Sequence, residues 1–423
     1  MDRVRSIIAQ QKKEKEYLLS RRYVPRDRLD FASRFVDDEL IKVITGPRRA
    51  GKSVFCFLLL GNREYAYLNF DDENLLKIAD TDALLRGITE VYGRSRMLFF
   101  DEIQNLKNWE LFAGKLKRRG MNLVLTGSNS RLLSRELSSA LTGRHVALEI
   151  LPFSFREFLA ARGVAHKGLD LSLPEEAGGV LHQLQDYVSI GGYPEVVTGG
   201  IEPAMYLGTL FDSTLLRDVV RRYSIRFPQK IYDLSLYLLS NTAAEFSFTR
   251  LKNVLAFNSV ATLQNYVRYL EEAYLISVLN RFSFKIQEQV KSPKKVYSID
   301  NGFLQVKAFH LSPNHGRLME NVVFQELLRR GNHPNHTLFF YRTRNQKEVD
   351  FVVKEGMKIR TLIQVCYRMT DVSERRETGA LIEAAEELSC SDMMMITWDT
   401  EGERHAGGRK VRLVPLWKWL LAE

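Results

Sequence analysis

Apolar residues occur along this chain in short continuous runs, each followed by a polar or glycine-rich turn. The run LIKVIT (40–45) is largely apolar and β-branched, which is typical of a strand buried on both faces of a parallel sheet. The run VFCFLLL (54–60) predicts a buried helix, and strand-like runs recur at 64–70, 96–100 and 122–126. Strands that alternate with helices up to residue 150 predict an α/β domain.

The middle of the chain shows a helical period instead. Residues 246–285 predict helix, turn, helix and strand, with Ser259 as the N-cap of the second helix. The apolar stripe of that helix consists of Leu263, Val267, Leu270 and Tyr274, and its outward polar positions are Thr262, Gln264, Asn265 and Arg268. A basic hairpin over 290–300 would follow as a β-wing. The pattern predicts a winged helix.

The last third of the chain returns to an α/β pattern. RLMENVVFQELLRRG (317–331) predicts an amphipathic helix that carries Glu320. The segment 337–353 predicts two strands with Glu348 and Asp350, and TLIQVCYRM (361–369) predicts a third strand. A helix with an acid, followed by strands with further polar residues, predicts a separate C-terminal α/β domain.

Composition narrows the class of protein. The 423 residues are 45% hydrophobic and 26% charged, which is ordinary for a soluble globular protein. No run approaches the ~18 apolar residues of a membrane span, so we expect no membrane partner. Three scattered cysteines without CxxC spacing indicate a cytoplasmic protein without a zinc site. The net charge of +10 favours an anionic partner, nucleic acid above all, although a soluble protein can also simply be basic.

A phosphate-binding loop follows the first strand. The segment fits G-x-x-x-x-G-K-[ST] and consists of Gly46, Pro47, Arg48, Arg49, Ala50, Gly51, Lys52 and Ser53. Its glycines let backbone N–H groups surround a phosphate at the start of a helix. Lys52 would contact the β- and γ-phosphates of ATP, and the Ser53 hydroxyl would bind Mg²⁺.

An acidic pair supplies the remaining chemistry of hydrolysis. RMLFFDEIQNL (96–106) is a strand that ends in Asp101 and Glu102. If this strand lies beside the phosphate-loop strand, Asp101 reaches the Mg²⁺ shell and Glu102 can deprotonate the attacking water. A phosphate loop with an acidic pair after a second strand predicts ATP hydrolysis rather than binding alone.

Two further segments offer polar residues for the same site. Thr126, Ser128 or Asn129, at the end of the strand segment NLVLTGSNS (122–130), would contact the γ-phosphate or the water, or would simply form a turn. Arg144 follows a glycine and has two interpretations. It is an arginine finger that acts on a neighbouring subunit of a homo-oligomer, or it pairs with an acid of its own chain.

The motifs resemble those of a prokaryotic AAA-type ATPase family. The matching segments are ITGPRRAGKS, YLNFDDENLL, LFFDEIQNL, LTGSNSRLL and LTGRHVALEILPFSFREF, in that order, and the resemblance runs from about residue 22 onward. The family's C-terminal domain of unknown function is similar to restriction-endonuclease-like nucleases. The expected divisions are a helical segment (1–30), the P-loop ATPase domain (31–185), a helical and winged-helix domain (186–298) and the nuclease-like domain (299–423).

The resemblance also defines a metal site that this sequence fills incompletely. Glu320, Asp350 and Gln364 stand where such nucleases hold Mg²⁺, but Cys366 replaces the expected lysine, and no other lysine of that strand replaces it. We therefore expect a vestigial nuclease site. In the winged helix, the basic wing residues Lys291, Lys294 and Lys295 would contact DNA phosphates. Alternatively, that module packs as a lid or contacts protein, and Glu271 and Glu272 weaken the DNA interpretation.

The interpretation is a cytoplasmic ATPase that ATP hydrolysis switches or assembles on DNA. Two alternatives belong to other classes. One is a metal-dependent DNA nuclease licensed by ATP, which the missing lysine disfavours. The other is an ATP-switched protein-interaction scaffold without nucleic acid, which the basic net charge disfavours.

Overall fold

The structure is a computed structural model that describes residues 2–78, 80–129, 143–164, 174–309 and 314–422. The parts of the family segments that fall in 130–142 lie outside this range. The chain folds as two compact units, one of residues 1–153 with 272–274, the other of residues 154–271 with 275–423. Among the described residues, no helix combines the length and the apolar character that crossing a bilayer demands.

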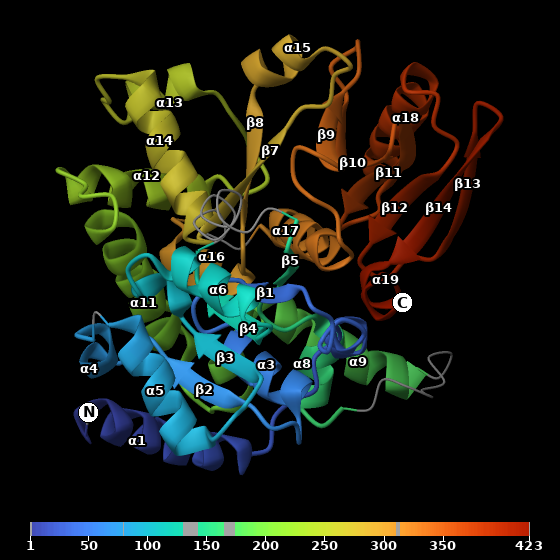
Figure 1. The fold of residues 1–423 in the computed structure, drawn as a ribbon. Coiled ribbons are helices and arrows are strands. Elements are labelled where there is room, and N and C mark those ends of the chain that lie inside the picture. The colour runs from blue at the N-terminus through green and yellow to red at the C-terminus, as the bar shows by residue number, and fades with distance from the viewer. Residues whose placement is uncertain (1, 79, 130–142, 165–173, 310–313, 423) are drawn as a thin grey trace. The chain divides into compact units, whose positions relative to one another are not determined.

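The first unit is an α/β layer structure (Figure 1). Its elements are α1 (Asp2–Leu19), α2 (Leu29–Ser33), β1 (Ile41–Thr45), α3 (Lys52–Leu60), β2 (Ala66–Asn69), α4 (Glu73–Leu76), α5 (Thr81–Tyr92), β3 (Met97–Asp101), the 3-10 turn η1 (Ile103–Asn105), α6 (Trp109–Arg118), β4 (Asn122–Gly127) and β5 (His145–Glu149). The strands form one parallel sheet in the order β2-β3-β4-β1-β5, and the predicted P-loop α/β domain is confirmed.

Alternate residues of each strand feed two separate cores. On one face, Val43 and Phe100 pack with Ile8 of α1, Leu84 of α5 and Phe112 of α6. On the other face, strand residues including Ile44, Val124 and Phe99 pack with Phe55 and Leu60 of α3. Both faces of the sheet are therefore covered by helices, which explains the continuous apolar runs in the strands.

The strand order corrects one expectation. The strand that ends in Asp101 does not lie beside the phosphate-loop strand, because β4 is inserted between β3 and β1. Parallel strands joined by helices need not be neighbours in the sheet, so their succession along the chain leaves the order open. All three strands still end at the same edge of the sheet, which brings their terminal residues together.

The second unit contains helices and two sheets (Figure 1). Its elements are α8 (Phe155–Ala161), α9 (Pro174–Ile190), α10 (Pro194–Thr198), α11 (Pro203–Thr214), the π-helix η2 (Leu215–Arg221), α12 (Pro228–Ser240), β6 (Glu245–Phe246), α13 (Phe248–Val254), α14 (Val260–Glu272), β7 (Ile276–Asn280), α15 (Ile286–Lys291), β8 (Lys294–Ser298), α16 (Asn301–Lys307), α17 (His315–Arg329), β9 (Leu338–Arg342), β10 (Glu348–Glu355), β11 (Lys358–Cys366), α18 (Asp371–Glu387), β12 (Met393–Thr397), β13 (Gly402–Ala406), β14 (Arg409–Pro415) and α19 (Leu416–Leu421).

The small sheet of this unit is antiparallel, with the order β6-β8-β7. The Ser259 hydroxyl accepts the N–H of Ala261 at 3.1 Å, which confirms the predicted cap of α14. The first three residues of the predicted apolar stripe are buried on that helix, whereas Tyr274 is buried just beyond its end. One expectation is wrong in detail. Val290 and Lys291 end the short helix α15 rather than a strand, and the Ser283 hydroxyl accepts the N–H of Lys285 in the turn before it.

The larger sheet is mixed and has the order β13-β14-β12-β11-β10-β9. Strands β9, β10 and β11 are antiparallel neighbours, whereas β11 and β12 run parallel. Leu381 and Ala384 of α18 pack on the sheet against Val352, Leu362 and Met395. Along the chain, the elements therefore follow as α17, β9, β10, β11, α18 and β12, a mixed α/β arrangement as predicted.

Candidate functional site

The phosphate loop lies between β1 and α3, as the motif predicts. Gly46 has a φ of 146°, and a Cβ there would lie 2.0 Å from the carbonyl oxygen of Ile150. Gly51 has a φ of 86° at the start of α3. Only glycine fits such a backbone so close to its neighbour. The loop therefore has the backbone that a phosphate cradle requires, and the N-terminus of α3 begins at its end.

A buried arginine that sequence reasoning missed holds this loop. Arg26 donates from Nη1 to the carbonyl oxygen of Ala50 at 2.8 Å and from Nη2 to that of Leu151 at 2.6 Å. Its guanidinium also lies 5.1 Å from the ring centre of Phe153. The residue ties the phosphate loop to the segment that follows β5. No motif marks it, because its role depends on a contact between distant parts of the chain.

Lys52 and Glu102 contact each other at the mouth of the loop. The Lys52 ammonium donates to the Pro47 carbonyl at 3.0 Å and lies 3.5 Å from Oε1 of Glu102. Gln104 donates to the other carboxylate oxygen at 2.5 Å. Burial would raise the pKa of Glu102, but Lys52 and the Gln104 hydrogen bond bring it below its usual value. Glu102 is thus held as a carboxylate, as a base requires.

Thr126 connects the two acids. Its hydroxyl makes a short hydrogen bond to Oδ1 of Asp101 and accepts the backbone N–H of Glu102 at 2.9 Å. Burial, and then the charge of Glu102, raise the pKa of Asp101 to about 6, against hydrogen bonds from Thr126 and Ser53. A hydroxyl and a carboxylate that already meet are hard oxygen donors of the kind Mg²⁺ prefers. Ser53 and Asp101 therefore fit the expected metal.

The other residues of the third predicted segment also end at this edge of the sheet. Ser128 and Asn129 are buried directly after β4. Gln104 donates to the Ser128 hydroxyl at 3.4 Å, so Gln104 contacts both Ser128 and Glu102. The sequence left three polar residues open, and of these Thr126 hydrogen-bonds with Asp101 and with the backbone of Glu102.

Arg144 lies away from this constellation. It is exposed and precedes β5, and its carbonyl accepts the N–H of Ile41 at the start of β1. Since β5 runs parallel to β1, Arg144 is at the edge of the sheet opposite to the phosphate loop, about 16 Å away over five strand residues. No acid of the described ranges forms an ion pair with it. Pairing with an acid is thus not observed, and the role in a neighbouring subunit stays a prediction.

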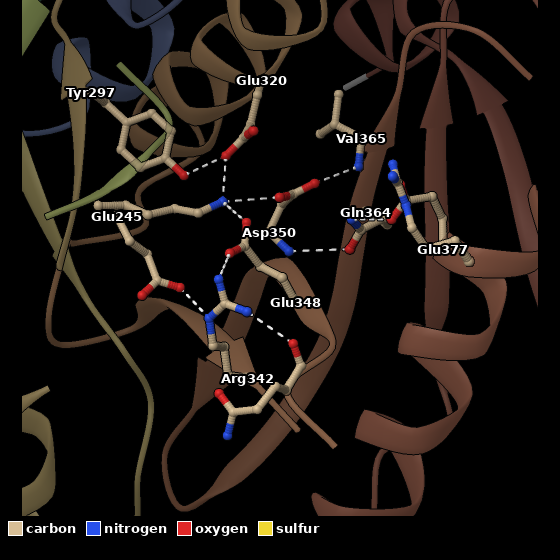
Figure 2. Close-up of polar contacts among 12 residues, drawn as sticks. Glu245, Tyr297, Glu320, Arg342, Glu348, Asp350, Gln364, Val365 and Glu377 are labelled. Atoms are coloured by element: carbon tan, nitrogen blue, oxygen red, sulfur yellow. Dashed lines mark hydrogen bonds and ion pairs between the residues drawn. The ribbon is translucent and has the colours of Figure 1, made fainter. Parts of the chain in front are cut away.

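A second polar cluster lies in the C-terminal part and has a lysine at its centre. The Lys295 ammonium lies 2.7 Å from Glu348 Oε1, 2.8 Å from Glu320 Oε1 and 3.0 Å from Asp350 Oδ1. Figure 2 shows the three carboxylates converging. This corrects the prediction that Lys295 contacts DNA from a wing, because its side chain is fully buried. Its neighbours are protein acids, since the residue faces inward from the middle strand of the β6-β8-β7 sheet.

The surroundings of these acids shift their protonation. Burial and the charge of Asp350 raise the pKa of Glu320 to about 8, although Lys295 opposes this. Tyr297 donates to the same oxygen of Glu320 at 2.8 Å. Burial lowers the pKa of Lys295, but the surrounding carboxylates outweigh it and raise the pKa well above its usual value. The lysine is therefore charged.

Gln364 and Cys366 end the third strand of the predicted nuclease site. Gln364 accepts the N–H of Asp350 at 3.2 Å and donates to Glu377 at 2.7 Å, so both ends of its amide are engaged within the protein. Asp350 accepts the N–H of Val365 at 2.9 Å (Figure 2). Cys366 is buried and donates to the Arg368 carbonyl at 3.3 Å. The structure brings Glu320 and Asp350 together on Lys295, whereas Gln364 contacts the backbone N–H of Asp350.

The other two predicted wing lysines differ from Lys295. Lys291 is exposed at the end of α15. Lys294 is half-buried and donates to the carbonyl of Gln289 at 3.1 Å, and burial lowers its pKa. Of the three predicted phosphate contacts, Lys291 is thus exposed, Lys294 is half-buried, and Lys295 is inside.

Comparison with known proteins places these features in a family. Residues 38–159 match the AAA domain, and 181–313 and 315–419 match two domains of unknown function. A solved Walker-type ATPase of Pyrococcus abyssi is similar over 68% of this chain and 99% of its own, with 16% identity and a TM-score of 0.44.

Two relatives of uncharacterised function match over nearly their whole length. One, from Methanocaldococcus jannaschii, is 36% identical over 90% of this chain and 88% of its own. Another, from Haemophilus influenzae, is 30% identical over 80% of this chain and 85% of its own. With a phosphate loop and an acidic pair at one edge of its parallel sheet, and with this identity and coverage, the chain belongs to the same family as these two proteins, with a P-loop AAA ATPase domain followed by two domains of unknown function.

Proposed function

We propose that the protein is an Mg²⁺-dependent ATPase whose cycle of ATP binding and hydrolysis switches or assembles it on DNA. The observation that carries the proposal is the meeting of Lys52, Ser53, Asp101, Glu102 and Thr126 at one edge of the sheet. These residues supply a phosphate charge contact, two oxygen ligands and a carboxylate base, the parts that phosphoryl transfer to water requires.

Each residue has a distinct role in this proposal. Bound Mg²⁺ would neutralise phosphate charge, with Ser53 and Asp101 as its protein ligands. Lys52 would leave Glu102 and contact the γ-phosphate, since the carboxylate and the phosphate are both anionic and compete for the same ammonium. Glu102 would then be released from Lys52 and accept the proton of the attacking water. Thr126 would hold Asp101 and the backbone of Glu102 in place during this change.

The proposed DNA partner rests on charge and on one helix. The chain carries a net charge of +10, which favours an anionic partner. The α14 residues Thr262, Gln264 and Asn265 are exposed on the face opposite its buried stripe, where a helix in a DNA groove would place polar side chains. A homo-oligomer is part of the proposal, because Arg144 is too far from its own phosphate loop to act there.

The test is the ATPase rate of the full chain with and without single-stranded and double-stranded DNA, together with filter binding of DNA with and without ATP. The proposal expects DNA binding that changes with nucleotide and a rate that DNA alters. Hydrolysis without any DNA binding at low salt would instead favour the ATP-switched protein scaffold.

For the C-terminal domain, we propose a nuclease-like fold without nuclease activity. The order α17, β9, β10, β11, α18 and β12 supports the fold, with Glu320 on the helix and Asp350 on the middle antiparallel strand. Both acids are ion-paired with Lys295, which argues against metal-dependent cleavage of DNA. Cleavage of plasmid DNA in Mg²⁺ or Mn²⁺ that Asp350→Ala abolishes would favour the ATP-licensed nuclease instead.

A further inference from the structure

The carboxylate cluster of the second unit matches its central lysine in number and geometry. An ammonium group has three N–H donors and no acceptor. The Lys295 ammonium has one contact of 2.7 to 3.0 Å with each of Glu348, Glu320 and Asp350. These acids come from α17 and β10, whereas Lys295 comes from β8. Three acids from two elements are therefore bridged by one cation from a third.

The backbone fixes this lysine in place. Strand β8 is the middle strand of its sheet, and Lys295 is paired with Glu245 of β6 on one side and Leu279 of β7 on the other. The Phe340 ring centre lies 5.8 Å from the ammonium, and the side chain has no exposed surface. To leave the cluster, the lysine would have to break its three ion pairs.

At its outer edge the cluster is partly exposed, because the side chains of Arg342 and Glu348 each keep 29% of their surface accessible. Arg342 donates to Glu348 Oε2 at 2.9 Å and makes a short hydrogen bond to Glu245, so a second cation neutralises the outer acids (Figure 2). In the described ranges of the chain, no group of three His, Cys, Asp or Glu side chains is arranged to hold a metal ion. The residues that the nuclease resemblance assigns to a metal thus do not fit one while Lys295 stands between them.

We propose that Lys295 is a built-in counter-cation that takes the position of a divalent metal ion among Glu320, Glu348 and Asp350, and so keeps the C-terminal domain free of metal. Lys295 is therefore not a substitute for the catalytic lysine that is missing at position 366. A catalytic lysine would lie beside the metal, whereas Lys295 contacts all three carboxylates in its place. The inference is independent of ATP hydrolysis in the first unit.

The experiment measures Mn²⁺ binding to the full chain by electron paramagnetic resonance, without nucleotide. Leaving nucleotide out means that the result does not depend on the proposed ATPase. The wild-type protein is expected to bind no Mn²⁺ at this cluster. Lys295→Met, which shortens the side chain by one atom and removes its charge, should bind about one Mn²⁺ with a dissociation constant on the order of 10⁻⁴–10⁻³ M, the range of weak Ca²⁺ sites built from protein oxygens.

Three matched variants locate the site. Lys294→Met changes the neighbouring lysine, whose ammonium lies outside the cluster, and should gain no binding. Lys295→Arg keeps a positive charge in the cluster and should also gain none. Adding Asp350→Asn to Lys295→Met should remove the gained site.

A folding measurement covers the case in which Lys295→Met is unstable. Three acids without their cation repel one another, and an ion that binds only the folded state stabilises it by mass action. Mn²⁺ should therefore raise the melting temperature of Lys295→Met, or restore its fold, and leave the wild type unchanged. Mn²⁺ bound by the wild type and lost on Glu320→Gln would overturn the proposal. So would a Lys295→Met protein that neither binds Mn²⁺ nor is stabilised by it.

Discussion

The ammonium of Lys52 lies 3.5 Å from the carboxylate of Glu102, and both side chains are almost fully covered. One of these residues is assigned to the phosphates of ATP and the other to the attacking water, yet here they neutralise each other. A γ-phosphate would compete with Glu102 for the same ammonium. In the proposed function, nucleotide binding and the release of the base are therefore coupled through this ion pair.

This coupling predicts different defects for the two residues. Lys52→Ala should abolish ATP binding or hydrolysis, because a main positive charge on the phosphates is lost. Glu102→Gln should retain ATP binding and stall hydrolysis, since Ser53 and Asp101 remain and the base does not. Equilibrium binding of labelled ATP and release of phosphate measure the two effects separately. Normal turnover by Glu102→Gln would assign the base to another residue.

The hydroxyl of Thr126 should matter for turnover more than for binding. Thr126→Val keeps the shape of the side chain but removes the hydrogen bonds to Asp101 and to the N–H of Glu102. Loss of such an orienting partner typically costs about 10–100-fold in activity or metal affinity. We expect kcat to fall by about that factor at saturating Mg²⁺. Thr126→Ser retains the hydroxyl and should stay close to the wild type, and equal losses in both variants would point to packing instead.

Local chemistry was predictable from the sequence at this site, but its spatial order was not. The spacing of Gly46, Gly51 and Lys52 specifies a backbone shape, and the acids at 101 and 102 follow an apolar run. Both signals are contained within about ten residues. That β4 separates β3 from β1 depends on how helices cross the sheet, which no local pattern records.

Lys295 shows the same limit more sharply. It lies in SPKKVYS directly beside Lys294, so the sequence predicts for both lysines a phosphate contact from the basic wing. The sequence signal for its position was the two-residue period of a strand, which places Lys295 and Tyr297 on one face. Both side chains contact Glu320. That signal identifies the face but not what it packs against. Arg26 offered no signal at all, since its partners Ala50 and Leu151 are backbone carbonyls far along the chain.

The role of Arg26 can be tested with a conservative change. Arg26→Lys keeps the charge but cannot reach both the Ala50 and Leu151 carbonyls in the same fork. A buried carbonyl left without its donor costs about 1–3 kcal/mol, part of which should appear in the position of the phosphate loop. We expect the KM for ATP to rise roughly tenfold, which corresponds to about 1.4 kcal/mol. Arg22→Lys, at an exposed position nearby, should leave the KM unchanged.

The position of Arg144 makes its role depend on a second subunit. If it acts as a finger in a neighbouring active site, Arg144→Ala should lower kcat by a factor on the order of 10³ while ATP affinity holds. The rate per subunit of the wild type should rise with protein concentration as the oligomer forms. Arg118→Ala, which changes another arginine near the same edge of the sheet, is the matched control. A rate per subunit that stays constant down to the dilute monomer would exclude the role.

The three lysines of the β7–β8 hairpin should contribute differently to the salt dependence of DNA affinity. Each phosphate contact contributes about 0.9 to the slope of log affinity against log salt. Lys291→Ala should therefore shrink the slope by nearly one, since Lys291 is exposed. Lys294→Ala should change it less, because the Lys294 ammonium already donates to the Gln289 carbonyl.

Lys295→Ala should not act through a phosphate at all. Removing this buried cation from its three acids should instead lower the free energy of unfolding by about 3–5 kcal/mol, measured by urea denaturation at the same salt. A full unit of slope lost on Lys295→Ala in a protein of unchanged stability would place Lys295 at the surface after all. An unchanged slope in Lys291→Ala would place the DNA surface on another element.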